Sequence, residues 1–173
     1  MRRLALFVLL LLVAALPAAA QRTELYDGTV SLQLPAGFRP MTPAEITLKY
    51  PRSQPPQFAF TSSDGLTQTI AVSRLRFPPG SPPPLGDLGN EMQRRVALQT
   101  GAVVHRHGLV EIGSRQWYAI EFQSPAADQP VENIMRVTMA NDHIIILTAN
   151  VVSRLFAENE AMLRQSVESV VVR

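Results

Sequence analysis

The chain has 173 residues, no cysteine, and 16 basic against 14 acidic side chains. Without cysteine, neither disulfides nor thiolate metal ligands are available, so packed apolar side chains have to hold the fold. A nearly balanced charge excludes the basic surplus that a nucleic-acid-binding surface needs, and we expect no nucleic-acid partner.

Residues 1–20 have the pattern of a cleavable secretory signal peptide. Two arginines are followed by an apolar run over residues 4–16, and small residues end at Ala20, before Gln21. The run is shorter than the ~20 residues of a membrane-spanning helix. We therefore expect cleavage between Ala20 and Gln21 and export to the periplasm, with further secretion left open. Because residue 21 is not cysteine, we expect no lipid anchor, and after cleavage no transmembrane segment.

Removing the signal peptide leaves residues 21–173, the size of one globular domain with 14 basic and 14 acidic side chains. Its first half predicts strands around a short helix. Apolar alternation predicts the strands at residues 29–34, 58–61 and 67–77. Thr42 and Glu45 have the spacing of a capping box, which predicts a helix that starts there and ends before Pro51.

The second half predicts a helix, an antiparallel meander and a closing helix. Asp87 is the expected cap of the first of these helices. The expected meander strands are residues 103–112, 116–123, 131–140 and 143–152, joined by hairpin turns. An apolar stripe predicts the last helix at about 155–170. These elements predict an α+β fold in which amphipathic helices cover a mostly antiparallel sheet.

This order of elements resembles the PsbP-like family of sandwich domains, which includes bacterial DcrB-like periplasmic proteins. The matching features are Leu34-Pro35-Ala36-Gly37-Phe38 at the end of the opening strand, then a small helix, a strand pair, a middle helix, a meander and a closing helix. The resemblance covers about residues 24–173. It implies an α/β/α sandwich and a role in binding or assembly. The family has no shared catalytic set, so the resemblance transfers no site residue to this chain.

His105 and His107 form the most prominent constellation for metal chemistry. Residues two apart on a strand project from the same face, so both imidazoles can meet one Zn²⁺ or Cu²⁺. A zinc site takes three or four protein ligands, so the rest would have to come from His143 or a carboxylate such as Glu111 or Glu121, and nothing in the spacing places His143 nearby. We therefore expect an exposed strand face without metal or other cofactor, and keep a site at His105 and His107 as the alternative.

Two further features are candidates for contact with a partner. Residues 78–84 contain five prolines, which predicts a loop, and Pro82, Pro83 and Pro84 are its candidate contact residues. Trp117, the sole tryptophan, is the other candidate, since exposed tryptophans are enriched at interfaces. The alternatives are a stiff connector and a tryptophan packed in the core. Glu121 and Arg136 can pair across strands, which we expect on a solvated face.

Catalytic motifs are absent from the sequence: it contains no G-x-S-x-G elbow, S-x-x-K, cysteine nucleophile or phosphate-binding glycine pattern. We therefore expect a non-catalytic module that binds an envelope protein or complex. One alternative is a small periplasmic hydrolase that uses His105 or His107 with a nearby acid. A structure in which histidine, serine and carboxylate meet in one pocket would favour it. Another is a carrier of a small apolar ligand in a cavity between helices and sheet.

Overall fold

The computed structural model describes residues 21–51, 54–62, 66–77, 80, 82–126 and 129–173. The expected signal peptide, with Ala20, lies outside these residues. The strands are β1 (Gln21–Leu25), β2 (Val30–Leu34), β3 (Arg39–Pro40), β4 (Phe58–Thr61), β5 (Gln68–Arg76), β6 (Val103–Ile112), β7 (Arg115–Ser124), β8 (Val131–Ala140), β9 (His143–Val152) and β10 (Val171–Val172). The helices are α1 (Pro43–Lys49), α2 (Leu85–Ala97), the 3-10 turn η1 (Ser153–Leu155) and α3 (Phe156–Glu168).

The described strands form two antiparallel sheets. The larger sheet has the order β3-β4-β5-β9-β8-β7-β6, and the smaller has the order β1-β2-β10. Strands β6 to β9 are successive neighbours, so the predicted meander is confirmed. Strand β5 pairs with β9, which joins the first half of the chain to the same sheet.

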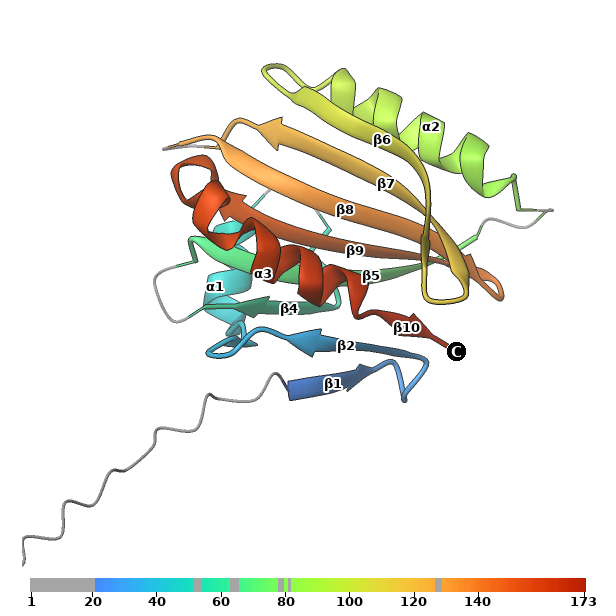
Figure 1. Cartoon of the computed structure of the whole chain (residues 1–173), viewed down its shortest axis with the longest axis horizontal. Coiled ribbons are helices and arrows are strands. Elements are labelled where there is room, and N and C mark those ends of the chain that lie inside the picture. Colours follow the sequence, from blue (N-terminus) through green and yellow to red (C-terminus); the bar gives the residue numbers. More distant parts are fainter. Residues whose placement is uncertain (1–20, 52–53, 63–65, 78–79, 81, 127–128) are drawn as a thin grey trace, which may run out of the picture.

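The two faces of the larger sheet are covered by different helices (Figure 1). Helix α2 packs over β6 and β7, where Tyr118, Ile120 and Phe122 form one apolar cluster. Helix α3 and strand β2 pack on the other face, over a core that includes Leu147 and Leu163. Because side chains alternate along a strand, each face of the sheet has its own apolar set. The predicted α/β/α sandwich of the α+β class is confirmed.

The start of α1 follows from its local sequence, whereas the start of α2 does not. At α1, Thr42 Oγ1 accepts a hydrogen bond from the Glu45 amide at 3.3 Å, and Glu45 Oε2 accepts one from the Thr42 amide at 2.7 Å. This is the predicted capping box. Helix α2 instead starts at Leu85, with Pro84 at the cap and no capping side chain, so the prediction of Asp87 as the cap is wrong. Asp87 lies in the first turn, where its charge favours the helix dipole.

Helix α2 lies directly on the Tyr118 ring. A Cβ atom at Gly89 would stand 2.0 Å from Tyr118 Cγ, well inside contact distance. Tyr118 is itself buried, and its hydroxyl donates a hydrogen bond to Asn90 Oδ1 on the same helix. The missing side chain at Gly89 therefore sets how closely the helix approaches the sheet.

The structure places Trp117 in the core instead of on a contact surface. Its side chain is 1% exposed and belongs to the same apolar cluster as Ile112 and Ala140. On β7, Trp117 points to the face that α3 covers, opposite to Tyr118. The buried indole therefore has no surface to offer a partner.

Candidate functional site

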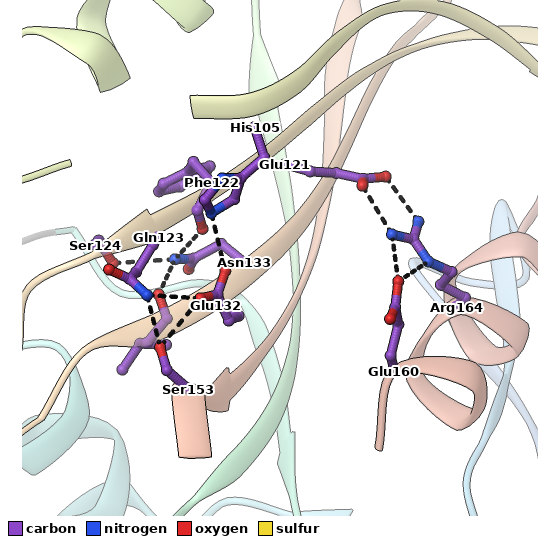
Figure 2. Close-up of polar contacts among 11 residues, drawn as sticks. His105, Glu121, Phe122, Gln123, Ser124, Glu132, Asn133, Ser153, Glu160 and Arg164 are labelled. Atoms are coloured by element: carbon purple, nitrogen blue, oxygen red, sulfur yellow. Dashed lines mark hydrogen bonds and ion pairs between the residues drawn. The ribbon is translucent and has the colours of Figure 1, made fainter. Parts of the chain in front are cut away.

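A pocket of about 320 Å³ opens on the α3 face of the larger sheet, beside the edge strand β6. We call it the Glu132 pocket (Figure 2). It is lined by His105, Glu121, Phe122, Glu132, Asn133, Ile134, Phe156 and Arg164.

Strand register brings the charged side chains of the pocket together. Glu121 on β7 is the partner of Ile134 on β8, and Gln123 is the partner of Glu132. Residues two apart on a strand share a face, so these four side chains all point toward α3. Helix α3 then closes one side with Phe156 at its start and Arg164 two turns later.

One wall of the pocket is a buried ion cluster centred on Glu121. Arg164 Nη1 and Nη2 each donate to a different Glu121 oxygen at 2.8 Å, and Arg136 Nη2 donates to Oε1 at 2.9 Å. Glu160 accepts from Arg164 Nε at 2.8 Å. The predicted Glu121–Arg136 pair therefore forms, but its environment differs from the solvated face that we expected: Glu121 is 8% and Arg136 3% exposed.

The two arginines keep Glu121 ionised. Burial raises the pKa of this carboxyl, but hydrogen bonds from Arg164 and Arg136 outweigh that effect and lower it to about 2. A carboxylate with such a pKa does not exchange protons near neutral pH, so Glu121 is unsuited to general acid–base catalysis. Its role at this wall is to join α3 to the sheet.

Glu132 forms the opposite wall and has a different set of partners. Its Oε1 accepts hydrogen bonds from Gln123 Nε2 at 2.8 Å and from Ser153 Oγ at 3.2 Å. Its Oε2 lies 3.4 Å from His105 Nε2. The Glu132 side chain is only 12% exposed. In the described part of the chain, no arginine or lysine nitrogen lies within 4.0 Å of its carboxylate.

A histidine and a serine thus both contact one pocket carboxylate, although Ser153 itself is not among the lining residues, and their order differs from that of a catalytic triad. In a triad the imidazole lies between the serine and the acid and takes the serine proton. Here the Glu132 carboxylate lies in the middle, and both His105 and Ser153 contact it. Ser153 Oγ also accepts from Gln123 Nε2 at 3.2 Å. Glu132 is therefore the group placed to take a proton from Ser153.

A β-bulge separates His105 from His107. Val104 pairs with Phe122 and Arg106 with Glu121, which leaves His105 without a ladder partner. His105 consequently faces Glu132 on the α3 side, whereas His107 Nδ1 lies 3.1 Å from the hydroxyl of Tyr118 on the α2 side. The expectation that the two imidazoles share a face is wrong. Within the residues that the structure describes, no three histidine or acidic side chains are grouped to hold a metal ion.

The other candidate contact residues lie away from this pocket. Pro82, Pro83 and Pro84 are exposed just before α2 and are not among the pocket residues, while Pro78 and Pro79 lie outside the described part of the chain. Sequence reasoning did not bring Arg164 or Ser153 to Glu121 and Glu132. One signal was available in the sequence. Glu121 and Glu132 each lie on the same strand face as apolar residues, which indicates that another element packs over these charges.

Sequence comparisons give no relative: neither a protein-family model nor a curated protein matches the chain. None of the helices in the described ranges is long and apolar enough to span a bilayer.

Solved structures do match the fold. Cyanobacterial PsbP (CyanoP) from Synechocystis sp. PCC 6803 has a TM-score of 0.66 at 13% identity, over 92% of this chain and 96% of that one. LpqN, involved in cell envelope biogenesis of Mycobacterium tuberculosis, has a TM-score of 0.60 at 11% identity, over 89% and 90%. The Saccharomyces cerevisiae Ran-binding protein Mog1p has a TM-score of 0.55 at 14% identity, over 90% and 96%. At these identities the likeness concerns the fold, and the chain has the PsbP-like fold.

Proposed function

We propose that this chain is an exported, non-catalytic accessory domain that binds an envelope protein through the Glu132 pocket. The observation that carries the proposal is a pre-formed, open pocket in which a largely buried carboxylate has no arginine or lysine partner among the described residues. Ligand sites are usually concave and pre-formed, with a few fixed polar groups. The signal-peptide pattern of residues 1–20 supports export.

The comparisons agree with a binding role without assigning one. Among the structures with this fold, Mog1p is a Ran-binding protein and LpqN is involved in cell envelope biogenesis. The acid–base groups of the pocket also favour binding. Glu121 is held ionised by two arginines, and in the described part of the chain no imidazole contacts Ser153 to activate it.

Site-directed photocrosslinking in living cells tests this proposal. Replacing His105 at the rim of the pocket with a photocrosslinking amino acid should give a discrete adduct with an envelope protein. The matched control is Leu48 on α1, which is 73% exposed and outside the pocket. Osmotic shock should release the protein with the periplasmic fraction. Retention in the cytoplasm, or identical adducts from both positions, would contradict the proposal.

A second candidate function is ester or amide hydrolysis with Ser153 as the nucleophile. It is favoured by one observation, the hydrogen bond from Ser153 Oγ to Glu132. We expect no turnover of a panel of p-nitrophenyl esters by the purified protein. Turnover that disappears in both Ser153→Ala and Glu132→Gln would replace the binding proposal with this one.

The charged walls of the pocket disfavour it as a site for the alternative apolar ligand.

A further inference from the structure

We infer that the Glu132 pocket binds the ammonium group of a lysine side chain supplied by the partner protein. The inference rests on the proposed function, because it identifies the chemistry by which the pocket recognises the partner.

Charge balance within the pocket is the first step. Glu121 is matched by Arg136 and Arg164, and Arg164 is shared with Glu160. Glu132 has no arginine or lysine match among the described residues: Gln123 and Ser153 donate to it, and its one titratable partner is the half-exposed imidazole of His105, 3.4 Å from Oε2. A carboxylate that is mostly withdrawn from water is costly unless a cation compensates it. The pocket therefore attracts a cation to Glu132.

The same geometry excludes an anionic ligand. Arg164 is the arginine that lines the pocket, and its Nε, Nη1 and Nη2 all donate to Glu121 or Glu160. These nitrogens already have carboxylate partners, so they do not attract a phosphate or carboxylate. An incoming anion would also face the unmatched charge of Glu132.

The shape of the acceptor favours ammonium over guanidinium. Oε1 of Glu132 already has two donors, so Oε2 is the one oxygen left for a ligand, and His105 approaches it at 3.4 Å. Arginine pairs best with two parallel oxygens, whereas the lysine ammonium is a compact point charge that one oxygen can hold.

An apolar side chain and a movable rim complete the site. Phe156 lines the pocket, is partly exposed and offers contact to the four-carbon stem of a lysine. The pocket volume of about 320 Å³ accommodates one such side chain. His105 is 49% exposed and sits at the bulge, so its imidazole can rotate away from Oε2 when the ammonium arrives.

Nuclear magnetic resonance titration of the isotope-labelled protein with Nα-acetyl-lysine methylamide tests the inference. We expect saturable shifts of the backbone amides of Glu132, Ser153 and Phe156. The norleucine analogue, which keeps the stem without the charge, should give at least tenfold weaker binding, and the arginine analogue should bind more weakly than lysine. Equal shifts with the norleucine analogue, or none with lysine, would overturn the inference without any variant having to fold.

Two variants localise the effect. Glu132→Gln should weaken lysine binding at least tenfold, whereas Glu111→Gln should not change it. Glu111 is an exposed glutamate on β6 and has no ion pair in the described part of the chain. If the photocrosslink at position 105 persists in Glu132→Gln, the binding function stands and the lysine inference fails. If the wild-type protein binds the lysine analogue but position 105 gives no adduct with an envelope protein, the proposed function fails instead.

Discussion

Glu121 on β7 and Arg164 on α3 form a two-point ion pair across 43 residues of sequence, with both N–O distances at 2.8 Å. Arg136 on β8 donates to the same carboxylate from within the sheet. This cluster fastens α3 to the larger sheet next to the Glu132 pocket, so the position of the pocket wall depends on it.

Replacing Glu121 with glutamine should destabilise the protein strongly. The change leaves the buried guanidinium of Arg136 without a counter-charge, and breaking such a pair from one side costs about 3–5 kcal/mol of unfolding free energy. Urea unfolding followed by circular dichroism measures the loss. Glu160→Gln is the matched control: Glu160 is 39% exposed, and losing its pair with Arg164 should cost less than about 1 kcal/mol. Equal losses for the two variants would contradict the buried role of Glu121.

The Glu121 cluster should also make stability depend on acid pH. Because the pKa of Glu121 in the folded protein is about 2, below its ordinary value of 4.5, its ionised form favours the folded state above about pH 4.5. That contribution is lost as the pH falls from about 4.5 toward 2. The difference in unfolding free energy between wild type and Glu121→Gln should therefore shrink across this window. Urea titrations at several pH values measure it, and a constant difference would refute the assignment.

Gly89→Ala should destabilise the packing of α2. The new methyl group would meet the Tyr118 ring at about 2.0 Å, and the ring is fixed by burial and by its bond to Asn90. Overpacking of this kind costs about 1–3 kcal/mol. Gly86→Ala on the same helix meets no atom within 4 Å and should leave stability unchanged or raise it by up to about 1 kcal/mol. Thermal unfolding of both variants distinguishes the clash with Tyr118 from the higher helix propensity of alanine. Helix propensity alone would shift the unfolding temperature of both variants in the same direction.

Trp117 should behave as a core residue in mutagenesis. Trp117→Ala should cost about 3–5 kcal/mol, because it leaves a large cavity. Trp117→Phe should cost much less, since the indole Nε1 is buried and has no hydrogen-bond partner among the described residues. Urea unfolding followed by circular dichroism gives both values. A negligible effect of Trp117→Ala on stability would instead place this residue at a surface.

The strands and helices were largely predictable because their signals are local. Alternation and turn residues predicted β6 to β9 and their neighbours, and the spacing of Thr42 and Glu45 predicted the start of α1. The short strands β1, β3 and β10 were missed. In β10, Val171 and Val172 are extended because they pair with β2, far away in the sequence, and nothing local distinguishes them from the end of a helix.

The candidate site was predictable only in part. Glu121 and Arg136 were correctly expected to pair because neighbouring strands bring them together. Their burial was not, because it comes from α3, whose Arg164 reaches Glu121 only after the helix has docked. The bulge that turns His105 away from His107 likewise appears only once β6 and β7 are paired.

By itself, the sequence determined the longer helices and strands of this protein, their order and the apolar stripes that make a sandwich, because these depend on side chains a few residues apart. Its first twenty residues also predict export. Only the tertiary structure decided which charges are covered, which histidine meets Glu132, and that Ser153 donates to the same carboxylate. These relationships join residues tens of positions apart through strand register and helix docking, and neither is specified by any short stretch of sequence.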